Sequence, residues 1–183
     1  MRIIFILLIV LLSVTACKSK YRKAADEIVA NAKPIYMNAG KEKYKLKIPD
    51  GWTTEQRNDY GVDYYFLRAP KTPDDPNTSI NVATEFMQNL SLDNYLTATI
   101  QSVKKGIPSA IISGQGEIVA NGVTGCWYSY NMEPQGIKAS LIAYIFSKNG
   151  VAYIITAGTQ TKDTAKYSST FDSVAKSFTF YHE

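Results

Sequence analysis

The chain of 183 residues has very few of the residues on which enzyme active sites commonly depend. It contains one histidine, His182, next to the last residue, and two cysteines, Cys17 and Cys126. Chain ends usually fray, so His182 is poorly placed to serve as the base of a Cys-His or Ser-His-Asp site. The sequence has no CxxC, HExxH or GxSxG motif and no phosphate-binding glycine loop. We therefore predict no catalytic residue, no bound metal and no cofactor.

The sequence also lacks a hydrophobic run long enough to span a membrane as a helix, which takes about 20 residues. An apolar run over residues 3–12 follows Arg2 and is followed by the short residues SVTA and then by Cys17. This pattern is typical of an export signal. The stretch VTAC resembles the lipobox of bacterial lipoproteins, whose signal is cut before the cysteine and whose thiol then carries a diacylglycerol. The resemblance implies that residues 1–16 are removed and that Cys17 is lipidated, with acyl chains such as palmitate in the membrane. An ordinary signal peptide with a coincidental cysteine is the alternative.

Positive charge is concentrated directly after Cys17. Residues 18–47 carry nine Lys or Arg against three acidic residues, whereas the chain from residue 48 onward carries ten against thirteen. A nucleic-acid binder should be basic on its folded surface, so this distribution argues against that class. We expect residues 17–41 to form a basic tether or short helix whose Lys18, Lys20, Arg22 and Lys23 contact an anionic membrane surface. A solvated tether is the alternative. Because no acidic residue follows the cysteine closely, sorting favours the outer membrane, facing the periplasm.

Cys126 has no internal partner once Cys17 carries lipid, so we predict no disulfide. In a strand it would share a face with Tyr128, Tyr130 and Met132, and such apolar surroundings raise the pKa of a thiol. We expect a buried, unreactive cysteine. A hydrolase that uses Cys126 as its nucleophile is the less favoured reading.

Hydrophobic periodicity predicts an α+β domain over residues 42–183. Apolar spacing predicts one helix that begins at Ser91 and ends before Gly106 and Pro108, and a second helix over residues 161–180. Asn-Gly pairs between strand-like runs predict two hairpins, over residues 117–130 and 141–158. Both faces of the second hairpin are apolar, so it should be central and covered on both sides. The expected fold is a central antiparallel sheet of six to seven strands flanked by helices.

The order of these segments resembles the PsbP family. The motifs run from IPDGW through a strand pair, the SLDNYL helix, the Asn-Gly hairpins and AYIITAGT to a final helix that ends in SVAKSF. The resemblance covers about residues 42–180 and implies the PsbP/Mog α/β sandwich. Plant PsbP is an extrinsic subunit of a membrane complex, and bacterial relatives are largely lipoproteins. The PsbP residues tied to photosynthesis are not recognisable here, so no photosynthetic role is implied.

Two aromatic stretches, NDYGVDYYF and CWYSYNM, form the best candidate for a partner-binding surface, although alternation should send at least half of their side chains into the core. The candidate residues are Tyr60, Tyr64, Tyr65, Trp127, Tyr128 and Tyr130. We predict a non-catalytic, membrane-anchored protein of the cell envelope that binds or stabilises an envelope protein. The alternative is a carrier of a small ligand, with a pocket between the sheet and the Ser91 helix.

Overall fold

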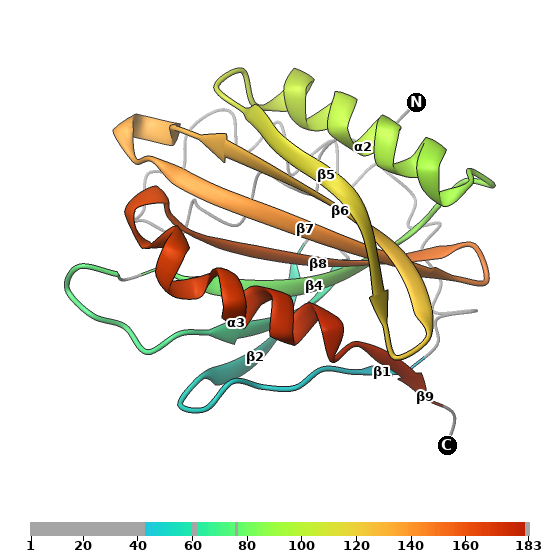
Figure 1. Cartoon of the computed structure of the whole chain (residues 1–183), viewed down its shortest axis with the longest axis horizontal. Coiled ribbons are helices and arrows are strands. Elements are labelled where there is room, and N and C mark those ends of the chain that lie inside the picture. Colours follow the sequence, from blue (N-terminus) through green and yellow to red (C-terminus); the bar gives the residue numbers. More distant parts are fainter. Residues whose placement is uncertain (1–42, 60–61, 76, 182–183) are drawn as a thin grey trace.

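A computed structural model describes the chain over residues 43–59, 62–75 and 77–181. The described residues form a seven-stranded antiparallel sheet, a two-stranded sheet and two α-helices (Figure 1). The strands are β1 (Lys43–Lys45), β2 (Thr53–Asp59), β3 (Val62–Arg68), β4 (Ser79–Phe86), β5 (Ile111–Ala120), β6 (Val123–Met132), β7 (Ala139–Lys148), β8 (Val151–Gln160) and β9 (Thr179–Tyr181). The helices are α2 (Leu92–Gly106) and α3 (Thr164–Lys176), with short 3-10 helices η2 (Pro134–Gly136) and η3 (Thr161–Asp163). The predicted α+β class is confirmed.

Strands in the main sheet follow the order β2-β3-β4-β8-β7-β6-β5, and every neighbouring pair is antiparallel. The β7–β8 hairpin lies at the centre, as its two apolar faces predict, because strands buried on both sides are apolar throughout. Asn121-Gly122 and Asn149-Gly150 have positive φ at both residues. These are the backbone angles of tight two-residue hairpin turns, so both predicted hairpins are confirmed.

Helix α2 covers one face of the main sheet, which we call the α2 face. Its N-cap is Ser91, whose hydroxyl accepts a hydrogen bond from the Asn94 N–H at 3.3 Å. Asp93 in the first turn and Lys104 and Lys105 in the last turn have the signs that the helix dipole favours. The buried stripe of the helix packs on the inward side chains of β6 and β7. The helix begins after Ser91, as the sequence predicts.

Helix α3 covers the opposite face, which we call the α3 face (Figure 1). The two-stranded sheet of β1 and β9 adds to this layer, because Tyr44 of β1 packs on Tyr153 and Phe178. The end of the predicted second helix is wrong. The helix ends at Lys176, Phe178 lies in the link after it and stacks on Phe146 at 4.5 Å, and Thr179–Tyr181 continue as β9. Phe178 fits the helical period of Tyr167 and Phe171, and the period alone cannot show that the chain has already left the helix.

Candidate functional site

The structure distributes the predicted aromatic residues over different surroundings instead of joining them in one patch. Tyr64 and Tyr65 are consecutive in β3, so Tyr64 faces the α2 side with 5% of its surface exposed, while Tyr65 packs, half-buried, on the α3 side. Tyr128 and Tyr130 are fully buried on the α2 face, and the half-buried Trp127 lies on the α3 face. Tyr60 lies outside the described residues. A partner could therefore reach only Tyr65 and Trp127 among the described members without disturbing the core.

Tyrosine rings fill the space between α2 and the main sheet. Tyr128 and Tyr130 stack with their ring centres 5.9 Å apart, and Tyr95 of α2 lies beside them in the same core cluster. The Tyr95 hydroxyl donates a hydrogen bond to the carboxylate of Glu85 in β4. The hydroxyls of Tyr128 and Tyr130 are buried without a hydrogen-bond partner among the described residues. The place where the alternative reading puts a ligand pocket is therefore occupied by side chains.

Glu85 is the most strongly perturbed acid of this layer. Burial raises the pKa of its carboxyl from 4.5 to about 7. The hydrogen bond from Tyr95 ties this carboxyl on β4 to the first turn of α2. The charge state of Glu85 therefore changes near neutral pH under the helix, a property that the sequence pattern did not indicate.

Cys126 lies in the same layer and is 3% exposed. Burial is the main cause that raises the pKa of its thiol to about 12, with a smaller contribution from the charge of Asp93. A nucleophilic cysteine needs an accessible thiolate, and at neutral pH this thiol is protonated and covered. The expectation of a packed cysteine is confirmed.

A second buried polar cluster fixes the loop before β4 to α3. Asp75 accepts hydrogen bonds from the Thr78 hydroxyl at 2.6 Å and from the Tyr167 hydroxyl at 2.6 Å, and the Thr78 hydroxyl also contacts that of Thr159 at 2.7 Å. Burial opposes ionisation of Asp75, but the hydrogen bonds from Thr78 and Tyr167 outweigh it and lower the pKa of the carboxyl. Every carboxylate oxygen has a donor, so this cluster is a structural clamp.

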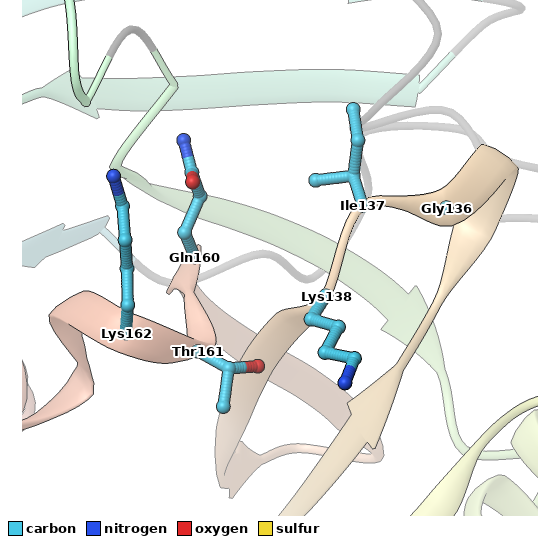
Figure 2. Close-up of a pocket in the computed structure, with 6 residues that line it drawn as sticks. All are labelled: Gly136, Ile137, Lys138, Gln160, Thr161 and Lys162. Carbon is cyan, nitrogen blue, oxygen red and sulfur yellow. The ribbon is translucent and has the colours of Figure 1, made fainter.

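One open hollow of about 380 Å³ lies where the link from η2 to β7 meets the end of β8. It is lined by Gly136, Ile137, Lys138, Gln160, Thr161 and Lys162 (Figure 2). In Figure 2 the side chains of Gln160 and Lys162 extend to one side and those of Lys138 and Thr161 to the other. The two ammonium groups do not converge, so the hollow lacks the focused set of polar groups that a ligand site requires.

Trp127 is the most accessible aromatic side chain of β6 and lies across the neighbouring edge strand. Its indole covers Gly114 and Gly116 of β5, so closely that a Cβ on either glycine would lie 3.2 Å or 3.0 Å from the ring. Any larger residue at these two positions would displace the ring. Because Gly114 and Gly116 have no side chains, the Trp127 indole can lie over β5, which is the outer strand of the sheet.

The remaining predicted site residues lie outside the described ranges. These are the lipidation residue Cys17 and the membrane-surface residues Lys18, Lys20, Arg22 and Lys23. Among the described residues, no three His, Cys, Asp or Glu side chains are grouped so that they could hold a metal ion. No helix in the described part of the chain has the length and apolar character needed to cross a membrane.

Comparison with solved structures places this fold among bacterial proteins of low sequence similarity. LpqN of Mycobacterium tuberculosis, which is involved in cell envelope biogenesis, superposes with a TM-score of 0.64 at 15% identity, over 86% of this chain and 96% of LpqN. PA94 of Pseudomonas aeruginosa, a protein of unknown function, superposes with a TM-score of 0.58 at 15% identity, over 76% of this chain and 99% of the PA94 chain. The cyanobacterial PsbP of Synechocystis superposes with a TM-score of 0.55 at 14% identity, over 81% of this chain and 100% of the PsbP chain.

These similarities show a shared fold. No curated protein sequence matches the chain significantly. The family comparison is more specific, because the match to PsbP extends over residues 36–180 and includes every described strand and helix except the last residue of β9. With its antiparallel sheet between α2 and α3, the chain belongs to the PsbP family.

Proposed function

We propose that this protein is a lipid-anchored member of the PsbP family that binds or stabilises a protein partner in the bacterial cell envelope and catalyses no reaction. The observation that carries the proposal is the junction at Cys17, where an export-type apolar run meets VTAC and then a basic segment. Acyl chains on Cys17 would hold the domain at a membrane, since each buried methylene contributes about 0.8 kcal/mol. Lys18, Lys20, Arg22 and Lys23 would add contacts to anionic headgroups.

The cysteine-hydrolase alternative depends on Cys126, the only cysteine among the described residues. Cys126 is covered by α2 and its thiol is protonated at neutral pH, which disfavours the cysteine-hydrolase alternative. The small-ligand carrier alternative expects a pocket between α2 and the sheet. Tyr95, Tyr128 and Tyr130 fill that space. LpqN, which has this fold, is involved in cell envelope biogenesis, and a role in the envelope agrees with the export signal that the sequence predicts for this chain.

An affinity pull-down from detergent-solubilised native membranes tests the proposal. The full chain is compared with Cys17→Ser, which removes the lipid acceptor, and with Cys126→Ala, which changes the other cysteine and keeps the anchor. We expect the wild type and Cys126→Ala to stay in the membrane fraction and to retain the same protein at a fixed ratio. We expect Cys17→Ser to be released from the membrane fraction. If Cys17→Ser stays in the membrane although its residues 1–16 have been removed, the anchoring part is wrong. If no protein is retained in proportion to the bait, the binding part is wrong.

A further inference from the structure

The two outer strands of the main sheet differ in chemistry. Edge strands expose unpaired backbone groups, and proteins usually protect them with charges, lysine or proline. β2, with the sequence TTEQRND, has Glu55, Arg57 and Asp59 within seven residues. β5, with the sequence IISGQGEIVA, has one charge, Glu117, within ten residues and contains no lysine or proline. Only β2 therefore carries the usual protection along its length.

β5 also exposes large apolar side chains. Ile111 is 70% exposed and Val119 is 62% exposed, at opposite ends of the strand. A β-bulge between Ile112 and Gly114 interrupts the pairing with β6 near the first end. From Gly114 to Ala120 the register with β6 is regular, and no other described strand pairs with the outer edge of this segment.

The register shows which backbone groups of β5 face outward. The turn Asn121-Gly122 has two residues, so Ala120 and Val123 form the closing hydrogen-bonded pair. Residues of an antiparallel strand alternate between pairs that exchange hydrogen bonds and pairs that do not. Gln115, Glu117 and Val119 therefore direct their N–H and C=O groups away from β6. This edge is complementary to another extended strand.

Each face of this edge has its own chemistry. On the α3 face, Gly114 and Gly116 have no side chains and Trp127 lies over them, so an added strand would meet the indole. On the α2 face, Gln115, Glu117 and Val119 are exposed. Side chains that lie opposite one another across two strands contact each other, so each face selects a residue type on the incoming strand.

We infer that the β5 edge from Gly114 to Ala120 binds the protein partner by accepting an extended segment of it as an eighth strand of the main sheet. This inference rests on the proposed function and names its surface. The segment has a large apolar side chain against Trp127 on one face, and a basic side chain beside Glu117 and an apolar one beside Val119 on the other. Main-chain hydrogen bonds supply affinity in this mode, and the alternating side chains supply specificity.

A matched pair of proline variants in the full anchored chain tests the inference. Gln115→Pro removes an outward N–H from β5, and Gln56→Pro makes the same change on β2, where the closing pair Asp59–Val62 likewise turns the Gln56 N–H outward. Neither variant removes a hydrogen bond between strands of the sheet. We expect Gln115→Pro to reduce retention of the partner by about tenfold and Gln56→Pro to leave it unchanged. Val119→Lys, at an exposed position, should act like Gln115→Pro while keeping every backbone group.

Photocrosslinking identifies the segment that binds to the β5 edge. Photoreactive benzoylphenylalanine replaces Val119 in one variant and Gln56 in a control variant. A Val119 adduct that maps to one extended segment of the retained protein, and that is lost in Gln115→Pro, supports the inference. Full retention of the partner by both Gln115→Pro and Val119→Lys overturns the inference and leaves the proposed function standing. An adduct of two copies of this chain also overturns it, because the occupant would then be a second copy. If the wild type retains no partner, the proposed function itself has failed.

Discussion

Buried carboxyl groups make the stability of this domain depend on pH. For Glu85 the folded-state pKa of about 7 lies above the value of 4.5 for the free side chain, so the folded protein holds this proton more tightly than the unfolded chain. The stability from this group is complete below about pH 4.5 and is lost as the pH rises through 7. Asp75, with a lowered pKa, has the opposite sign and acts at lower pH.

We therefore expect the free energy of unfolding to fall by roughly 2–3 kcal/mol between pH 4.5 and pH 7.5. The Glu85→Gln variant should lose most of this dependence, because its amide stays neutral and can still accept the Tyr95 hydrogen bond. Urea denaturation at several pH values measures the free energy of unfolding of the wild type and of Glu85→Gln. An equal pH dependence in the two proteins would contradict the assignment to Glu85.

The tyrosine hydroxyls of the same layer make different contributions to stability. Tyr130→Phe removes a buried hydroxyl that has no partner among the described residues, so it should leave stability unchanged or raise it by up to about 1 kcal/mol. Tyr95→Phe removes the donor to Glu85 and should lower stability by about 1–2 kcal/mol. The two rings are of one type and one burial class, so each variant controls for the other in thermal denaturation. Equal effects of the two substitutions would contradict the hydrogen-bond assignment.

Cys126 gives a direct chemical test of its burial. In the Cys17→Ser variant it is the only thiol, and we expect a maleimide to label it at least about 100-fold more slowly in the native protein than in denaturant. The cause is the protected position under α2 and the protonated state of the thiol. Rapid stoichiometric labelling of the native protein would restore the hydrolase alternative.

At the scale of elements, Gly125 of β6 is required by the neighbouring hairpin. A Cβ at this position would lie 2.6 Å from the carbonyl oxygen of Ile145 and 2.6 Å from the Phe146 ring. Gly125→Ala should therefore destabilise the domain by about 1–3 kcal/mol through overpacking. Gly158→Ala in β8 is the matched control, because its Cβ would meet only Leu141, at 3.4 Å, and we expect a change near zero. Similar melting temperatures for the two variants would be inconsistent with this packing.

The same elements show which parts of the fold could be predicted from the sequence. Asn-Gly pairs specify two-residue turns, so the hairpins and the central place of β7 and β8 followed from local chemistry and apolar patterning. The first half of β5 was missed because Gly114 and Gly116 disfavour strands, and their reason is the indole of Trp127, which lies on another strand. β2 was missed because TTEQRND has no apolar alternation.

The site residues were harder to predict for a related reason. Alternation correctly indicated that consecutive tyrosines such as Tyr64 and Tyr65 face opposite sides. Which hydroxyl finds an acceptor depends on residues distant in the sequence, since Glu85 reaches Tyr95 only when α2 packs on the sheet. The exposed edge of β5 likewise depends on the strand order, because nothing in the local sequence makes it the last strand.

At the scale of the whole molecule, the proposed anchor and the β5 edge are complementary. Acyl chains on Cys17 would confine the domain to a membrane surface, which raises the effective concentration for a partner confined to the same surface. A binding edge of moderate intrinsic affinity would then be sufficient. The acidic balance of the chain after residue 47 would keep the body of the domain from adhering to the anionic surface along its whole length.

We propose above that the mature protein begins at Cys17 and is held to a membrane by lipid on that residue. Intact-mass spectrometry of the protein purified from its native membranes tests this most directly. We predict a chain that starts at Cys17 and carries the additional mass of a diacylglycerol group or more, with the modification mapped to the first residue. A chain that retains residues 1–16, or one whose Cys17 thiol is unmodified, would contradict the account.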